Sequence, residues 1–249
     1  MNIAIVGYGK MGQEVEKAAK ARGINVKSII DPNGSNAYRE VNEKSMRDVD
    51  VCIDFTTANA VIGNVEKISK FRKNIVIGTT GWYDNLDKIR NIAKKGKIGI
   101  IYSSNFSIGV NVFFKIVENA AKLINKAEDY DIYGYELHHN KKIDSPSGTA
   151  KSIGEILTKN IKRKNRLLFD RINRKIQPNE LHFASVRAGS MPGTHVVGFD
   201  SPADTIELKH TARNREGFAI GAVMAAQWIQ NKKGFYNIDD MIKSIIWED

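Results

Sequence analysis

The segment Asn2-Ile3-Ala4-Ile5-Val6-Gly7-Tyr8-Gly9-Lys10-Met11-Gly12 decides the fold of the first half of the chain. An apolar strand over residues 2–6 runs into the pattern G-x-G-x-x-G, and the next apolar residues have helical spacing (Met11, Val15, Ala18 and Ala19). Gly7 permits a tight turn, Gly9 lets a pyrophosphate approach the backbone, and Gly12 allows close helix–strand packing. We therefore expect a dinucleotide-binding unit whose phosphate loop is formed by Gly7, Tyr8, Gly9, Lys10, Met11 and Gly12.

An acidic residue follows the second expected strand, Val26 to Ile30. Asp31 comes nineteen residues after Gly12, where a carboxylate suits the ribose hydroxyls of NAD. Pro32-Asn33-Gly34 follow it without an arginine for a 2′-phosphate. We expect NADH to bind well, and Lys10 keeps NADPH open as an alternative cofactor. A glycine-rich turn without a ligand is the rival interpretation, and the agreement of strand, spacing and acid disfavours it.

Three further apolar strands are expected at Val51–Phe55, Ile75–Ile77 and Ile98–Tyr102, each followed by small polar residues. In an open parallel sheet the carboxyl ends of the strands form the ligand crevice. The residues expected there beside the nicotinamide half of the cofactor are Gly78, Thr79 and Thr80, although each could be an ordinary turn residue. Five strand–helix units predict an α/β fold with a Rossmann-type doubly wound parallel sheet.

The character of the chain changes after Ser107. A long apolar helix is expected to reach Ile124, and a C-terminal helix is expected from about Arg215 to Gln230. Between them, strands are expected over residues 130–137, 181–187, 194–199 and 205–210, with hairpin-like loops at 189–193 and 200–203. This arrangement predicts a second α+β domain with a mixed or antiparallel sheet.

Titratable side chains gather between Glu136 and Ala150, which we expect to be a loop between a strand end and a helix start. His138 and His139 titrate near neutral pH, and Lys142 can donate a proton or pair with an anion. The helix start can hold a carboxylate or phosphate through the N–H groups of Gly148, Thr149 and Ala150 and the hydroxyl of Ser147. The bland alternative is two half-buried histidines beside a turn, with Ser147 as a plain N-cap.

The composition of the 249 residues is typical of a soluble globular protein, with 42% hydrophobic and 27% charged residues. No apolar run approaches the roughly 18–20 residues of a membrane span. The sequence begins on a strand without a signal-peptide pattern, so we expect a cytoplasmic protein. The single cysteine, Cys52, cannot form an intramolecular disulfide or a thiolate metal site by itself, and we expect it to be inert core. We expect no bound metal.

The net charge of the chain is +10, and its basic residues are densest from Lys159 to Lys175. Phe169 is the only aromatic residue in that run, so single-stranded nucleic acid is poorly supported as a partner. We interpret the run as a solvated face that steers anions, and we expect neither a nucleic-acid nor a membrane partner.

The pattern Glu136-Leu137-His138-His139-x-x-Lys142-x-Asp144-x-Pro146-Ser147-Gly148-Thr149-Ala150 resembles the signature of the dihydrodipicolinate reductase family. Supporting stretches in family order include 7–12, 54–56, 78–81, 105–107, 186–189 and 210–215. The resemblance implies an NAD(P)H-dependent oxidoreductase that reduces 4-hydroxy-tetrahydrodipicolinate, a cyclic dicarboxylate, to tetrahydrodipicolinate with loss of water. That reaction belongs to diaminopimelate and lysine biosynthesis.

The resemblance also implies roles for single residues. It makes His138 the proton donor or acceptor and Lys142 the second proton donor. It assigns the substrate carboxylates to His139, Gly148 and Thr149, and adds cofactor contacts at Ser103, Ser104, Asn105 and Phe106. It further implies a homotetramer built through the second domain's sheet, and a terminal segment that returns to the cofactor domain. The expected division is therefore residues 1–106 with 215–249 for cofactor binding, and 107–214 for substrate binding and oligomerisation.

Two other classes of function remain open. A related two-domain reductase could act on another amino-acid-derived substrate, but the aspartate-semialdehyde enzymes need a nucleophilic cysteine, and Cys52 lies in an expected buried strand. A non-catalytic NAD(P)H-binding redox sensor could bind nucleic acid through its basic surface. It would have no use for the histidine–lysine cluster, and the sequence has no recognisable helix-turn-helix or zinc motif.

Overall fold

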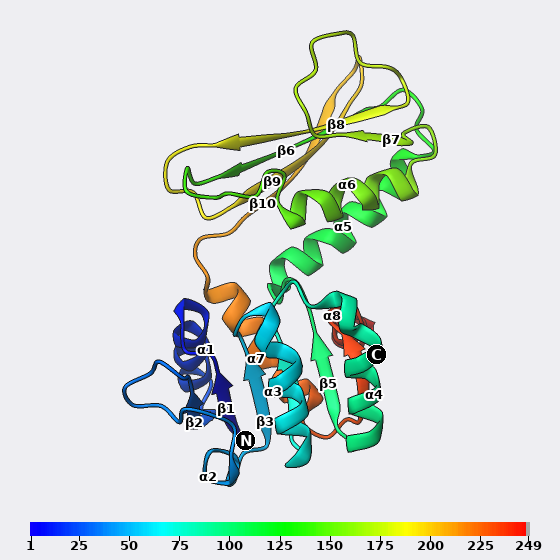
Figure 1. The fold of residues 1–249 in the computed structure, drawn as a ribbon. Coiled ribbons are helices and arrows are strands. Elements are labelled where there is room, and N and C mark those ends of the chain that lie inside the picture. The colour runs from blue at the N-terminus through cyan, green and yellow to red at the C-terminus, as the bar shows by residue number, and fades with distance from the viewer. Residues whose placement is uncertain (248–249) are drawn as a thin grey trace. The chain divides into compact units, whose positions relative to one another are not determined.

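The computed structural model describes residues 1–247, and the chain divides into two compact units (Figure 1). The first unit combines Met1–Ile108 with the C-terminal segment that starts at Arg215, and the second is Gly109–Asn214. Each unit contains its own sheet.

The first unit has a six-stranded parallel sheet in the order β11-β5-β4-β3-β1-β2. Its strands are β1 (Asn2–Val6), β2 (Asn25–Ile30), β3 (Val51–Asp54), β4 (Asn74–Ile77), β5 (Gly99–Tyr102) and β11 (Gly234–Asn237). Its helices are α1 (Lys10–Ala21), α2 (Glu43–Met46), α3 (Ala58–Lys70), α4 (Leu86–Gly96), α7 (Glu216–Ile229) and α8 (Ile238–Trp247), with a 3-10 turn η1 (Tyr83–Asn85). The expected Rossmann-type sheet is confirmed.

Both faces of this sheet are covered, which explains why its strands are almost continuously apolar. Ile3 and Ile5 of β1 pack in one core with α1 and α7, while Ala4 and Val6 pack in a second core with α3 and α4. Strand β11 pairs with β5 as a sixth strand that sequence analysis missed. Its four residues, Gly-Phe-Tyr-Asn, are too few to show a period.

Cys52 lies at the centre of β3 and is fully buried, as expected. Burial raises the pKa of its thiol to about 12, so the reactive thiolate is absent at physiological pH. The expectation of an inert core cysteine is confirmed.

The second unit has a five-stranded mixed sheet in the order β10-β9-β6-β8-β7. Its strands are β6 (Asp131–His138), β7 (Arg166–Leu168), β8 (Glu180–Arg187), β9 (Thr194–Asp200) and β10 (Thr205–Thr211). The helices α5 (Ile108–Ile124) and α6 (Gly148–Asn160) supply buried side chains to a core with one face of this sheet. The expected α+β domain with a mixed sheet is confirmed.

One expected connection of the second sheet was wrong. The loop 189–193 does not close a hairpin, because β6 lies between β8 and β9 and pairs with both. Strands β8 and β6 are parallel, whereas β9 and β6 are antiparallel. Within residues 109–214, only the turn after Asp200 joins two antiparallel strands that are neighbours in the sheet, β9 and β10. Strand order depends on long-range pairing, which turn residues do not report.

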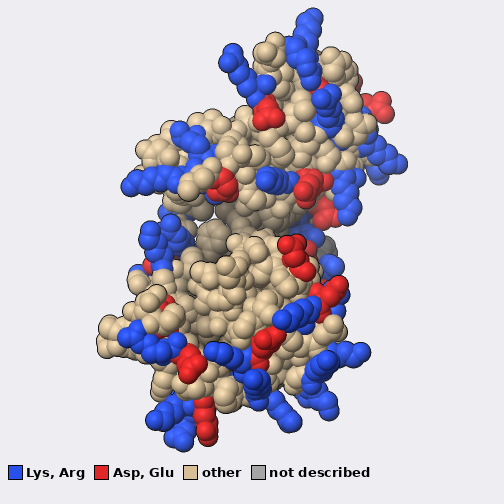
Figure 2. Space-filling view, in the orientation of Figure 1, with Lys and Arg blue, Asp and Glu red and all other residues tan. Residues whose placement is uncertain are grey.

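The basic run from Lys159 to Lys175 is not simply a solvated face. Lys164 is buried, pairs with Asp131 and donates to the Glu180 carbonyl oxygen. Arg163 donates to backbone carbonyl oxygens near the end of α5, including that of Tyr130 at 2.7 Å. On the face in Figure 2, basic side chains are spread over both units with acidic ones among them. Lys164 and Arg163 of this run therefore stabilise the second unit.

No helix within residues 1–247 is long and apolar enough to cross a membrane.

Candidate active site

The glycine loop has the backbone geometry that a dinucleotide requires. Gly7 has φ of +87°, and a Cβ on Gly12 would lie 2.2 Å from the Gly7 carbonyl oxygen. A Cβ on Gly9 would meet no atom within 4 Å, so its backbone is open to approach. Helix α1 begins at Lys10 without a side-chain cap. Its positive end is therefore suited to a pyrophosphate.

Asp31 is held in place by the neighbouring backbone. Its Oδ2 accepts from the Tyr8 N–H and its Oδ1 from the Asn33 N–H, both at 2.8 Å. These hydrogen bonds lower the pKa of the Asp31 carboxyl, so it is ionised at neutral pH. Arg39, which sequence analysis missed, is exposed and donates to the Pro32 carbonyl oxygen in the same turn. Arg39 is eight residues after Asp31, and the shape of the loop between them cannot be read from the sequence. The spacing therefore did not indicate that Arg39 lies in this turn.

The turns after β3 and β4 are braced by a buried carboxylate. Asp54 is fully buried and accepts from the hydroxyls of Thr56 and Thr79 and from the Asn64 amide, at 2.7–2.8 Å. Burial is the dominant influence and raises the pKa of Asp54. The Thr79 hydroxyl thus hydrogen-bonds within the protein, to Asp54, whereas Thr80 is exposed. Gly78 lies against the Phe55 ring, which a Cβ would approach to 2.2 Å.

The segment after β5 folds back on itself. The Ser103 hydroxyl bridges the backbone N–H and carbonyl oxygen of Asn105, and the Asn105 side chain accepts from the Ser107 N–H. Ser104 is exposed, whereas the Phe106 side chain is 2% exposed and belongs to the core. The carboxyl ends of β1, β3, β4 and β5 share one edge of the parallel sheet, so the segments that follow them are gathered there.

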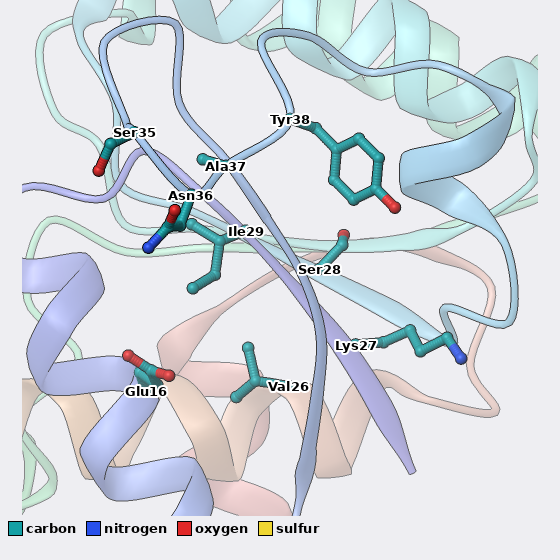
Figure 3. Close-up of a pocket in the computed structure, with 9 residues that line it drawn as sticks. All are labelled: Glu16, Val26, Lys27, Ser28, Ile29, Ser35, Asn36, Ala37 and Tyr38. Carbon is teal, nitrogen blue, oxygen red and sulfur yellow. The ribbon is translucent and has the colours of Figure 1, made fainter.

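A pocket of about 450 Å³ lies elsewhere in the first unit, between α1, β2 and the loop before Tyr38 (Figure 3). Its lining residues are Glu16, Val26, Lys27, Ser28, Ile29, Ser35, Asn36, Ala37 and Tyr38. None of the expected cofactor residues lines it, although Glu16 accepts a hydrogen bond from the Tyr8 hydroxyl. We therefore locate the candidate cofactor site at the strand ends and not in this pocket.

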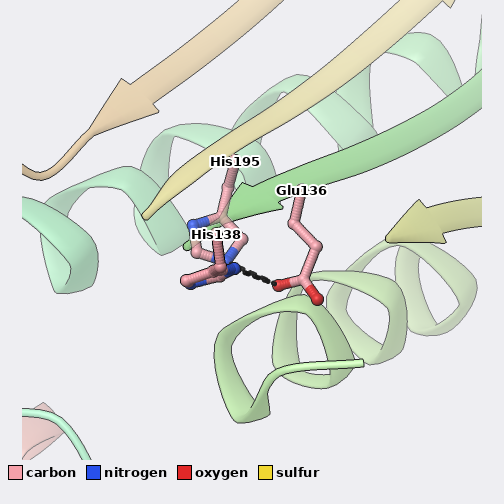
Figure 4. A group of neighbouring side chains, drawn as sticks. All are labelled: Glu136, His138 and His195. Carbon is pink, nitrogen blue, oxygen red and sulfur yellow. Dashed lines mark ion pairs between the residues drawn. The ribbon is translucent and has the colours of Figure 1, made fainter. Parts of the chain in front are cut away.

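The catalytic candidate His138 is not on a loop, contrary to expectation. It is the last residue of β6 and is 6% exposed. Glu136, two residues earlier, points to the same face, and His195 of β9 is the cross-strand partner of Glu136 (Figure 4). Both His138 Nδ1 and His195 Nε2 lie 3.3 Å from Glu136 Oε2. The strand position holds the imidazole more rigidly than a loop would.

Glu136 is a fully buried carboxylate that sequence analysis did not assign a role. Its Oε1 accepts from the Ser147 N–H, the Ser185 hydroxyl and Arg187 Nη2, at 2.8–2.9 Å. Burial opposes ionisation, but the contacts of His195, Ser147 and Arg187 together hold the pKa of Glu136 well below its usual range. A permanent anion therefore lies beside His138. His195 and Arg187 are far from Glu136 in sequence and gave no local signal.

Burial lowers the pKa of His138 to about 4, and the nearby Glu136 carboxylate only partly offsets this effect. The imidazole is accordingly neutral at neutral pH when no ligand is bound. A dianion placed beside it would favour the protonated form.

We expect this buried imidazole to make the protein acid-sensitive. Between pH 6.5 and 4 the unfolded chain binds a proton at His138 and the folded chain does not, so the free energy of unfolding falls as pH falls through this window. Above pH 6.5 His138 is neutral in both the folded and the unfolded chain, so the protein keeps the full free energy of unfolding that is lost at lower pH. His138→Gln should flatten the pH dependence over this interval, as measured by urea unfolding at a series of pH values. Equal slopes in both proteins would contradict the assignment.

The remaining candidates surround the start of α6. Lys142 pairs with Asp144 at 2.7 Å, and the His139 N–H donates to the Met191 carbonyl oxygen. The Ser147 hydroxyl caps the helix by accepting from the Ala150 N–H and also contacts His195 Nε2 at 3.2 Å. The Ala150 N–H is therefore not free, contrary to expectation. Gly148 is exposed, and a Cβ there would meet nothing within 4 Å.

The glycine loop on a parallel sheet, the ionised acid after β2 and a second unit rich in titratable groups together define a two-domain, nicotinamide-dependent oxidoreductase. Family models described as the N-terminus and C-terminus of dihydrodipicolinate reductase match residues 1–106 and 109–242. The chain belongs to the dihydrodipicolinate reductase family.

Individual relatives agree with this assignment. The chain is 39% identical to the 4-hydroxy-tetrahydrodipicolinate reductase of Christiangramia forsetii, covering 98% of this chain and 99% of the relative. It is also 39% identical to the reductase of that name from Archaeoglobus fulgidus, covering 98% and 100%. A dipicolinate-bound dihydrodipicolinate reductase from Paenisporosarcina sp. TG-14 has the same fold, with a TM-score of 0.78, 24% identity and coverage of 97% and 99%.

These matches confirm the family expected from the histidine–lysine pattern. The chain is an NAD(P)H-dependent oxidoreductase with the reductase role in diaminopimelate and lysine biosynthesis, and it uses a nicotinamide cofactor.

Proposed function

We propose that the first unit binds NADH in preference to NADPH and that the second unit binds and protonates 4-hydroxy-tetrahydrodipicolinate during its reduction. The buried Glu136–His138 pair carries the proposal, because it combines a rigidly held imidazole with a permanent neighbouring anion. When bound, the cofactor would supply the hydride for ring carbon C4 of the substrate, and the C4 hydroxyl leaves as water once it has taken up a proton. The residues of this chain bind, orient and protonate.

His138 acts through its Nε2 atom. Its Nδ1 faces Glu136 Oε2 at 3.3 Å, so Nε2 is the nitrogen left for the substrate. Gly193 keeps room beside it, since a Cβ there would lie 2.9 Å from Nε2. The substrate's two carboxylates raise the pKa of His138 from about 4, so that the imidazole carries a proton when the substrate is bound. Glu136 then stabilises the imidazolium form.

The substrate carboxylates bind at the positive end of α6. Gly148 and Thr149 open this thirteen-residue helix, and His139 and Lys142 precede it. A helix N-terminus and a cation both stabilise a carboxylate. Because the Ser147 hydroxyl is occupied by its capping and His195 contacts, we propose that it orients the helix start rather than donating to the substrate. Lys142, paired with exposed Asp144, acts as the second proton donor.

NADH is the preferred cofactor because the ionised Asp31 accepts ribose hydroxyls and repels a 2′-phosphate. We expect Asp31→Ser to shift the ratio of kcat/KM for NADH over kcat/KM for NADPH towards NADPH by about tenfold to a hundredfold. The reason is the loss of the repulsion between Asp31 and the 2′-phosphate, which is on the order of 1–3 kcal/mol. Steady-state rates with each cofactor measure it. Asp50→Ser, an exposed aspartate outside the loop, is the control. An unchanged ratio in Asp31→Ser would refute the role.

We also propose a cytoplasmic homotetramer that assembles through the second sheet. Tyr133, Tyr135 and Leu137 of β6 alternate with residues that face the core, and Val186 lies opposite Leu137 and is 46% exposed. Helices α5 and α6 pack with the opposite face. Light scattering should give the mass of four chains for the wild-type protein. Val186→Lys should give a lower mass.

The proposed reaction is tested by following oxidation of NADH and NADPH with substrate generated in situ from pyruvate and aspartate-semialdehyde. Rapid oxidation that requires the coupled substrate is expected, faster with NADH. Binding of both nucleotides without turnover would redirect the assignment to a related reductase with another anionic substrate.

A further inference from the structure

Glu136, His138 and His195 place three metal-binding side chains on the same face of the second sheet (Figure 4). Two come from β6 and the third from β9, and strand pairing sets Glu136 directly opposite His195. One ligand atom from each lies within 4.8 Å of the other two. The arrangement is therefore part of the sheet framework and does not depend on a loop.

The spacing fits a tetrahedral ion. Zinc bonds of about 2.0–2.1 Å at tetrahedral angles hold two ligand atoms about 3.3–3.4 Å apart. The His138 Nδ1–Glu136 Oε2 and His195 Nε2–Glu136 Oε2 separations are both 3.3 Å. Only the two imidazoles, at 4.8 Å or less, need to approach each other.

The ligand atoms are poorly satisfied by the protein itself. Among residues 1–247, Glu136 Oε2 and His138 Nδ1 have no hydrogen-bond partner although they are buried, and His195 Nε2 has outside the cluster only the Ser147 hydroxyl, at 3.2 Å. Buried polar atoms in this state cost free energy that a bound ion recovers. The side chains of His138, Glu136 and His195 are 8%, 0% and 6% exposed, so an ion there would be shielded from water.

The surroundings of Glu136 also orient it as a ligand. Ser147, Ser185 and Arg187 all bind Oε1, which leaves Oε2 turned towards the two imidazoles. Such outer contacts typically tune metal affinity by about 10–100-fold. Arg187 pairs with Glu136 at 2.8 Å and offsets its charge, which weakens the attraction of the site for a dication. The bound ion should therefore exchange.

We propose that Glu136, His138 and His195 reversibly bind a Zn²⁺-type transition-metal ion and that this ion inhibits the reductase. Two imidazoles and one carboxylate suit zinc and leave a fourth position open. An ion on His138 Nδ1 prevents the imidazole from carrying protons on both nitrogens, and therefore from forming the imidazolium that is the proposed proton donor. The inhibition rests on the proposed function of His138, whereas the binding does not.

Binding is tested with Co²⁺ as a spectroscopic probe of the full chain after chelator treatment. The wild-type protein should develop the visible absorption of low-symmetry Co²⁺, and Zn²⁺ should abolish it. His195→Gln should weaken Co²⁺ binding at least tenfold. His182→Gln, which changes a β8 histidine outside the cluster, should bind like the wild type. Equal absorption in the wild type and His195→Gln, or none in the wild type, would overturn the site.

Inhibition is tested separately with NADH and the coupled substrate. Zn²⁺ should lower the rate of the wild type and of His182→Gln equally, and EDTA should restore both. Co²⁺ binding at the cluster without loss of rate would overturn the inhibitory half of the proposal. A protein that binds Co²⁺ as expected but shows no reductase activity in the absence of metal would instead refute the proposed function and leave the metal site standing.

Discussion

His138→Gln is expected to lower kcat by about 10²–10⁴-fold, the usual contribution of a positioned general acid or base. Glutamine retains hydrogen-bonding capacity but cannot transfer a proton near neutral pH. NADH affinity should stay within about twofold, because His138 lies in the second unit and the proposed cofactor contacts lie in the first. Steady-state kinetics and fluorescence titration with NADH measure the two quantities.

Lys142→Ala provides an independent test of the same site. A smaller loss of kcat is expected, accompanied by a higher KM, because Lys142 is proposed both to attract the dicarboxylate and to donate a proton. Lys141→Ala removes a neighbouring exposed lysine and is the matched control for net charge. His182→Gln, which makes the same substitution outside the site, is the matched control for His138→Gln. Undiminished turnover in both His138→Gln and Lys142→Ala would refute the residue roles.

Gly221→Ala is expected to cause the largest loss of stability. A Cβ on Gly221 in α7 would lie 1.7 Å from the Phe106 carbonyl oxygen, a backbone atom that cannot swing aside. Overpacking costs about 1–3 kcal/mol or more, and a loss of about 3 kcal/mol corresponds to roughly 6–12 °C in Tm. Because the displaced backbone carries Asn105 and Phe106, NADH binding should weaken as well. Thermal unfolding followed by circular dichroism measures the shift.

Gly217 in the same helix is the matched control. A Cβ there would meet its nearest neighbour, the Ser107 hydroxyl, at 3.5 Å, an ordinary contact. Gly217→Ala should therefore be neutral or stabilising by up to about 1 kcal/mol through helix propensity. The same chemical change is thus expected to act in opposite directions one helical turn apart. Equal melting temperatures for the two variants would contradict the close approach of α7 to Phe106.

The sequence by itself determined the features that local patterns encode. The apolar run of β1 and the three glycines after it predicted the first βα turn, because that turn depends on neighbouring residues and on positions without a Cβ. The spacing to Asp31 and the apolar strands predicted the parallel sheet for the same reason. The pattern from Glu136 to Ala150 was sufficient to indicate the family.

Only the tertiary structure decided which distant residues meet. The pairing of β6 with β8 and β9 brings Arg187 and His195 to Glu136 and buries His138, and this burial is the main reason why the pKa of His138 is lowered. The return of β11 to β5 and the contact of Gly221 with Phe106 depend likewise on chain segments more than a hundred residues apart. Local periodicity carries no information about such pairs, because strand order and burial arise from the whole core and not from adjacent residues.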